Sequence, residues 1–264
     1  MSLRHTLRRL CLATVASSAL FAGAAHAGLY TANFGAVVPN YQANDDETFT
    51  VTLPFAFTFF GASYTSAIVS NNGNIQFGTQ SGAYISSPLN TQTDFRGIAA
   101  FWSDLESRAD PLGAIAAGTG GSAVYMNVVN ADQVVFTWDR LGYYDRDYAS
   151  RVQFQLVLNN STALQAGEGT IGFFYGDMNG QTGGRQAAIG FGDGLLGVNV
   201  GEVSVSSGLS TDVAAYANRV GNVWFNVTED GTPQQTDLPE PASLALAGMA
   251  LGALGLARRR RNAR

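Results

Sequence analysis

The chain has 264 residues, a formal net charge of −5 and a single cysteine. Residues 28–238 contain seven arginines and 19 acidic residues, which give this segment a net charge of −12, and they contain no lysine, histidine or cysteine. Such an acidic segment is repelled by phosphate backbones, which argues against nucleic acid as a partner. The missing residue types also exclude Ser–His–Asp triads, Cys–His dyads, Schiff-base lysines and zinc sites built on His or Cys.

The first 27 residues have the organisation of a secretory signal peptide. Basic residues precede an apolar stretch over residues 10–25, and small residues close it at Ala25 and Ala27. This A-x-A pattern predicts cleavage between Ala27 and Gly28. A membrane-spanning helix is the alternative, but the apolar run is short for a bilayer. We therefore expect export, and the cysteine, Cys11, leaves with the signal.

Residues 28–232 have the periodicity of strands and predict one all-β domain. Asn71-Asn72-Gly73 and Asn130–Gln133 lie between apolar runs and predict hairpin turns. Apolar residues alternate with Gln153 and Gln155, which predicts one packed face and one face at least partly exposed to water. Strands are expected at residues 49–61, 66–78, 122–141, 152–158, 170–175, 187–191 and 223–227. With hardly a helical period, the pattern predicts an antiparallel β-sandwich, flanked by an N-terminal signal helix and a C-terminal hydrophobic helix.

Acidic residues in this body are candidate calcium ligands, because calcium prefers oxygen atoms. Asp104 and Glu106 are two residues apart, as are Asp145 and Asp147, and another acidic run begins at Asp45. No EF-hand spacing closes a ligand set, and solvated loop carboxylates are the commoner explanation. A glycosidase would need two carboxyl groups facing each other across a cleft, and the spacing selects no such pair. We predict no catalytic residue, no cofactor and no metal requirement. Calcium binding at Asp104, Glu106, Asp145 and Asp147 is left open.

Aromatic residues are concentrated in one stretch of the body. Tyr143, Tyr144 and Tyr148 follow Trp138 closely. These rings could stack on sugars, or they could form a buried core with tyrosines at its rim. The sequence leaves both interpretations open.

Five blocks in the middle of the chain occur in the order of those in the NIDO domain, an extracellular module named after nidogen. They read GIAAFWSDLESR (97–108), VVFTWDRLGYY (134–144), VQFQLVL (152–158), IGFFYGDM (171–178) and AAIGFGDG (187–194). The motif residues include Phe101, Trp102, Asp104, Trp138, Tyr143 and Tyr144. One departure is Ala100, where members often have proline. The resemblance implies a NIDO-like β-sandwich over residues 28–232 that associates with the cell matrix and lacks catalytic activity.

The C-terminal stretch LPEPASLALAGMALGALGLARRRR (238–261) resembles a PEP-CTERM sorting signal. It places Pro239, Glu240 and Pro241 in a linker over residues 233–241, before a hydrophobic helix with a basic cluster over 242–264. The cluster consists of Arg258, Arg259, Arg260 and Arg261. The apolar run is at the short end for crossing a bilayer, and the arginines favour a cytoplasmic end. A permanent tail anchor and a plain stop-transfer helix are the alternatives.

The sorting resemblance implies an exosortase-type membrane protease as a partner and a Gram-negative host that makes exopolysaccharide. The protein would be inserted transiently in the inner membrane and then reach the cell surface or extracellular matrix. We therefore expect a non-catalytic role in cell–matrix adhesion, or in biofilm through association with exopolysaccharide or another matrix component. A carboxylate-based glycoside hydrolase acting on exopolysaccharide is the alternative, and a structural component without a specific ligand is a third.

Overall fold

A computed structural model describes residues 28–78, 82–85, 89, 92, 94–108, 122–181, 183–194, 203–228 and 232–235 of the chain. These residues belong to one compact unit, Ala27–Thr236. The expected signal peptide and C-terminal helix, the Pro239–Pro241 motif and the four arginines lie outside the described residues. Within the described ranges, no helix combines the length and the apolar character needed to cross a bilayer.

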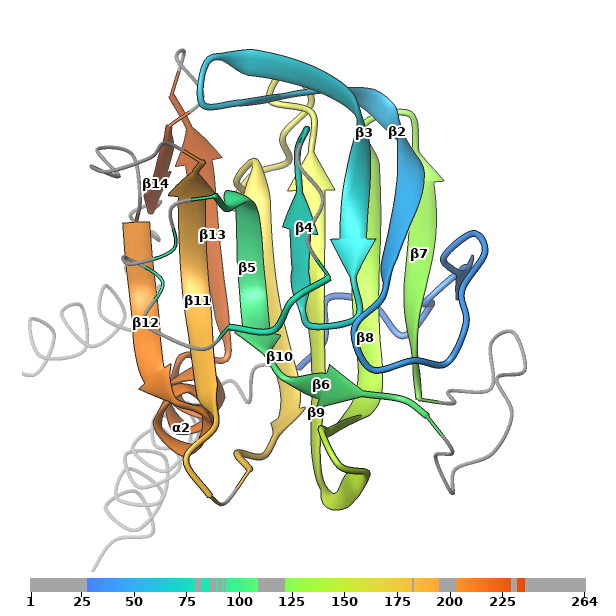
Figure 1. Cartoon of the computed structure of the whole chain (residues 1–264). Helices are drawn as coiled ribbons and strands as arrows, with labels where there is room; N and C mark the ends of the chain where they lie inside the picture. Colours follow the sequence, from blue (N-terminus) through green and yellow to red (C-terminus); the bar gives the residue numbers. More distant parts are fainter. Residues whose placement is uncertain are drawn as a thin grey trace, which may run out of the picture. The chain divides into compact units, whose positions relative to one another are not determined.

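Two antiparallel sheets lie one over the other (Figure 1), as the strand pattern predicts. The first has the order β1 (Ala36–Val37), β7 (Ala123–Asn130), β8 (Gln133–Tyr143), β9 (Asp147–Asn159), β10 (Ile171–Met178), β13 (Asn222–Val227) and β14 (Pro233–Gln235), with β6 (Leu105–Glu106) paired to β8. The second has the order β12 (Val203–Leu209), β11 (Gln186–Asp193), β5 (Arg96–Ser103), β4 (Asn74–Gln76), β3 (Ala62–Ser70) and β2 (Thr48–Phe59). The fold class is therefore the predicted antiparallel β-sandwich.

The core lies between the sheets and is rich in aromatic side chains. Phe101 of β5 meets Phe154 of β9 with ring centroids 5.8 Å apart, and Phe173 of β10 meets Phe191 of β11 at 5.6 Å. All four side chains are fully buried. Burial of each such side chain contributes about 1.5–3 kcal/mol. These contacts stabilise a body that has no cysteine for a disulfide.

The predicted hairpin turn at Asn71–Gly73 is present between β3 and β4, where Ser70 pairs with Asn74. Gly73 has φ +85°, and a Cβ atom on it would lie 1.9 Å from the carbonyl oxygen of Phe101. Glycine is therefore needed both for the turn and for its close approach to β5. The second predicted turn is also present but tighter, because Asn130 and Gln133 already pair and the turn itself is Ala131-Asp132.

One helix, α2 (Ser210–Val220), follows β12 and departs from the expectation of hardly any helical period. Its buried face consists of Ser210, Val213, Ala214 and Ala217, spaced as one side of a helix. Because only one of these side chains is larger than alanine or serine, the apolar signal in the sequence is weak. The helix ends before Gly221, whose N–H donates to the carbonyl of Ala217 at 2.8 Å.

The outer face of the first sheet is drier than the Gln153–Gln155 alternation predicts. Gln155 is fully buried because the segment after the expected cleavage site crosses this face. The amide of Gln155 accepts from the N–H of Thr31 at 3.1 Å and donates to its carbonyl at 2.9 Å. The ring of Tyr30 packs 5.1 Å from that of Phe174. The polar side chain thus faces a covering segment of the same chain, which lies before β1.

Candidate functional site: an acidic corner of the sandwich

Acidic residues from separate parts of the sequence meet where the segment before β2, strand β6 and the β8–β9 turn come together (Figure 1). We call this cluster the acidic corner. Its members are Asp45, Asp46, Asp104, Glu106, Arg108 and Arg185.

Two buried asparagines of the β3–β4 turn hold this corner together. The side chain of Asn72 accepts from the N–H of Leu105 at 2.7 Å and donates to Oδ1 of Asp46 at 2.7 Å. The side chain of Asn71 accepts from the N–H of Glu47 at 3.0 Å and donates to backbone carbonyls of the same segment. The turn predicted from the sequence therefore fixes the segment before β2 against β6.

The arginines pair with three of the four carboxylates. Arg108 reaches Oδ2 of Asp45 at 2.9 Å and Oε1 of Glu106 at 2.5 Å, and Arg185 reaches Oδ2 of Asp104 at 3.0 Å. The second oxygen of Glu106 accepts from the N–H of Arg146 in the β8–β9 turn at 3.0 Å. Both oxygens of Glu106 are thus engaged, one by nearby Arg108 and one by the β8–β9 turn.

The aspartates are less completely satisfied than Glu106. Oδ1 of Asp104 and Oδ1 of Asp45 are buried and have no hydrogen-bond partner. Burial raises the pKa of Asp104 to about 6, although the Arg185 guanidinium opposes this shift. Burial also raises the pKa of Asp45, against the attraction of Arg108. Buried polar atoms are nearly always paired in proteins, so two such oxygens in one cluster require an explanation.

One oxygen from each of Asp45, Asp46 and Asp104 lies within 4.8 Å of the other two. Such oxygen-only groups suit hard cations such as calcium. Of the four acids considered as calcium ligands from the sequence, Asp104 belongs to this group and Glu106 lies beside it. The acidic run that begins at Asp45 was noted in the sequence, but Asp45 and Asp46 were not among those four candidates.

Asp145 lies in the β8–β9 turn and Asp147 is the first residue of β9, and neither joins this group. Asp145 is exposed and has φ +65°. Oδ1 of Asp147 accepts from the N–H groups of Ala149 and Ser150 at 3.2 and 3.3 Å, so this carboxylate has a local role at the start of β9.

The aromatic motif residues divide between the core and the surface. Phe101, Trp138 and Tyr143 are fully buried and Trp102 is nearly so, which makes them unavailable as sugar platforms. Tyr144 is 40% exposed, and the guanidinium of Arg185 lies 4.6 Å from its ring centroid. Tyr144 is thus the exposed member of the motif, beside the acidic corner.

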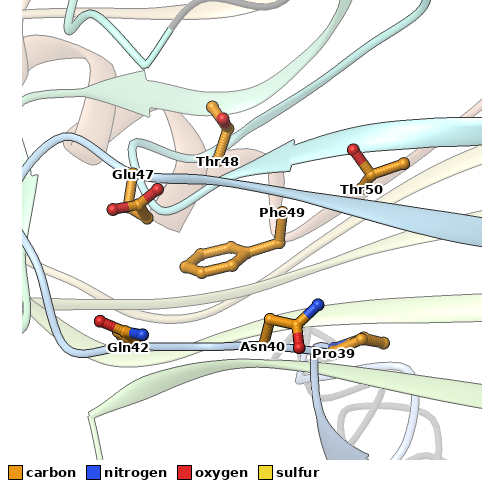
Figure 2. A pocket seen from close by; sticks show the side chains of 7 residues that line it. All are labelled: Pro39, Asn40, Gln42, Glu47, Thr48, Phe49 and Thr50. Atoms are coloured by element: carbon orange, nitrogen blue, oxygen red, sulfur yellow. The ribbon is translucent and has the colours of Figure 1, made fainter.

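A pocket of about 280 Å³ lies at the start of β2 (Figure 2). Its lining residues are Pro39, Asn40, Gln42, Glu47, Thr48, Phe49 and Thr50. Figure 2 shows the Phe49 ring between β2 and the segment that holds Asn40 and Gln42. Glu47 is the single carboxylate among these lining residues, so the pocket does not present two opposed acids of the kind that glycoside hydrolysis uses.

The fold and the corner define an all-β sandwich domain with an acidic end. The chain belongs to the NIDO-related family, whose sequence model matches residues 21–232. A PEP-CTERM protein-sorting motif matches residues 237–261. Both resemblances seen in the sequence are thereby confirmed, and the motif implies export through the membrane by way of an exosortase-type system. No curated protein and no solved structure shows a significant match to the chain.

Proposed function

We propose that this protein is a non-catalytic binding domain of the cell surface or extracellular matrix, which associates with exopolysaccharide or another matrix component. An exosortase-type protease would release it from the inner membrane of a Gram-negative host near Pro239–Pro241. The sorting motif at residues 237–261 supports delivery to this location. The NIDO-related body at residues 21–232 supports a role in adhesion.

The observation that favours binding over hydrolysis is the state of the acidic corner. The side chains of Asp104 and Glu106 are 3% and 0% exposed, and each is paired with an arginine. The raised pKa of Asp104 is a property that a general acid would share. A glycosidic oxygen must nevertheless reach the acid that protonates it, and this carboxylate is buried.

Tyr144 is the contact that we favour for a polysaccharide. The Arg185 guanidinium lies over its ring, and the residue is 40% exposed. A ring held in this way can stack on the apolar face of a sugar without a large loss of side-chain entropy. The adjacent guanidinium can donate hydrogen bonds to hydroxyl or carboxylate groups of the polymer.

The test of binding is co-sedimentation of the mature protein with exopolysaccharide from its host. We expect Tyr144→Ala to weaken binding about tenfold, corresponding to about 1.4 kcal/mol, and Tyr144→Phe to retain it because the ring is kept. Val128→Ala is the control, since Val128 is 52% exposed and lies on β7 outside the corner. Equal binding by all variants would contradict a role for Tyr144.

The test against catalysis is zymography on the same polymer with wild type, Asp104→Asn and Glu106→Gln. We expect no hydrolysis by any of them. Hydrolysis by the wild type that one substitution abolishes would overturn the non-catalytic proposal and favour the glycoside hydrolase.

A further inference from the structure

Three carboxylates of the acidic corner converge on one small space. One oxygen from each of Asp45, Asp46 and Asp104 lies within 4.8 Å of the others. Asp45 and Asp46 come from the segment before β2, whereas Asp104 lies between β5 and β6. Like charges this close destabilise a fold unless a positive partner lies among them.

The protein already orients each of these carboxylates through one oxygen. Arg108 binds Oδ2 of Asp45 and Arg185 binds Oδ2 of Asp104. The amide of Asn72 donates to Oδ1 of Asp46. Ligands fixed by neighbouring donors in this way are typical of metal sites, where surrounding groups set the direction of each carboxylate.

Asp104 and Asp45 each have a second carboxylate oxygen that lacks a hydrogen-bond partner in the protein. Oδ1 of Asp104 and Oδ1 of Asp45 are buried and accept no hydrogen bond. The side chain of Asp104 is 3% exposed, so bulk water does not compensate for the missing donor. This independent observation distinguishes the group from a solvated acidic cluster.

The negative charges of the acidic corner also outnumber its positive charges. Its four carboxylates face two guanidinium groups, which leaves a net charge of −2 when all are ionised. A divalent cation supplies the missing charge. Ligands that are all carboxylate oxygens favour hard cations over zinc or copper, and calcium accepts irregular geometry completed by water. Asp46 is exposed and leaves a path for the ion and its waters.

We propose that Asp45, Asp46 and Asp104 bind one calcium ion. The ion joins the segment before β2 to the end of β5. Its ligands do not include Tyr144, the proposed polysaccharide contact, and its effect on stability needs no polymer. A failure of polymer binding would therefore leave this site untouched.

The test uses the mature protein from its host, stripped with a chelator and titrated with calcium chloride in a calorimeter. We expect one site with a Kd of about 10⁻⁴–10⁻³ M, the range of extracellular calcium modules. At a calcium concentration ten times the Kd, the apparent folding constant rises about 11-fold, so the melting temperature increases. Asp104→Asn should weaken calcium binding at least tenfold.

Asp145→Asn is the matched control, because it removes an exposed acid close in sequence but outside the group, and asparagine tolerates its positive φ. It should bind calcium as the wild type does. Asp46→Asn provides a second variant if the buried ones fail to fold, since Asp46 is exposed and asparagine still accepts from Asn72. It should fold normally in chelator and bind calcium more weakly. No calcium response in the wild type, or an unchanged response in both Asp104→Asn and Asp46→Asn, would overturn the proposal.

Discussion

At the scale of single residues, Asn72 links two parts of the chain that are distant in sequence. It is fully buried, and its side chain bonds to Leu105, Asp46 and the carbonyl of Gly82. Leu105 is buried and Gly82 is half-buried, so the Asn72 side chain pairs backbone groups that water reaches poorly and holds the acidic corner together.

We predict that Asn72→Ala lowers the free energy of unfolding by about 2–4 kcal/mol, because the substitution removes the hydrogen-bond partner of the buried N–H of Leu105 and that of the half-buried carbonyl of Gly82. Chemical denaturation would measure this loss. Asn130→Ala is the control, since Asn130 is exposed at the end of β7 and its side chain accepts from the N–H of Asp132 at 2.7 Å. Its cost should stay near 1 kcal/mol or below, and equal losses for the two variants would argue against the bridging role of Asn72.

The buried carboxyl group of Asp139, on β8, is expected to make the stability of the fold depend on pH. Burial raises its pKa, while the Gln153 amide at 2.6 Å and Arg140 oppose the shift. A raised folded-state pKa means that the folded protein binds the proton more tightly than the unfolded chain. This contribution to stability is full below the unfolded value of about 3.9 and is lost as pH rises through the folded value.

Asp139→Asn should remove this part of the pH profile. Relative to the variant, the wild type is expected to lose stability as the pH rises above the unfolded pKa of about 3.9. Unfolding free energies at a series of pH values test this, with Asp145→Asn as the exposed control. Parallel curves for wild type and Asp139→Asn would refute the assignment.

At the scale of elements, the β3–β4 hairpin fits against β5 with no room for a side chain at its turn. Gly73 (φ +85°) and Gly167 (φ +87°) have nearly the same backbone conformation. A Cβ on Gly73 would collide with the Phe101 carbonyl, whereas nothing lies within 4 Å of one on Gly167. Substituting each glycine in turn therefore separates the free-energy cost of a side chain in the left-handed conformation from the cost of its clash with a neighbour.

Gly167→Ala should cost about 1–2 kcal/mol, the penalty of a left-handed residue with a side chain. Gly73→Ala should cost at least about 2 kcal/mol more, because the strands must also separate. Denaturant midpoints of the two variants give the comparison. A Gly73→Ala variant no less stable than Gly167→Ala would show that the hairpin can move away from β5.

Elements with strong periodicity could be predicted, and those that depend on distant partners could not. The alternation in β9 and the Asn71–Gly73 turn are local signals, and both elements formed. The helix α2 was missed because its buried side chains are mostly alanine and serine. Gln155 was expected to be partly wet because alternation cannot reveal that Thr31 covers it. The candidate site was found in part, since no spacing rule joins Asp45 to Asp104.

At the scale of the whole molecule, sorting depends on the C-terminal motif. We predict that replacing Pro239, Glu240 and Pro241 with alanine leaves a membrane-bound product that retains Arg258–Arg261. The wild type should instead yield a mass that begins at Gly28 and ends near Pro239, recovered with the extracellular polymer. Fractionation with intact-mass measurement distinguishes the two products, and Pro233→Ala in β14 is the control. A wild type that keeps its arginines would indicate a permanent anchor.

The segment that covers the outer face of the first sheet has a consequence for the timing of maturation. If cleavage falls after Ala27, only Gly28 and Leu29 precede Tyr30, whose ring lies 6.0 Å from that of Trp224. Two extended residues span about 7 Å, too little for a docked Tyr30 to reach a membrane-embedded peptidase. With cleavage at that bond, docking of this segment would follow removal of the leader. An unprocessed precursor would keep Gln155 uncovered. Burial of Gln155 under the segment around Thr31 would therefore occur only in chains from which the leader has been removed.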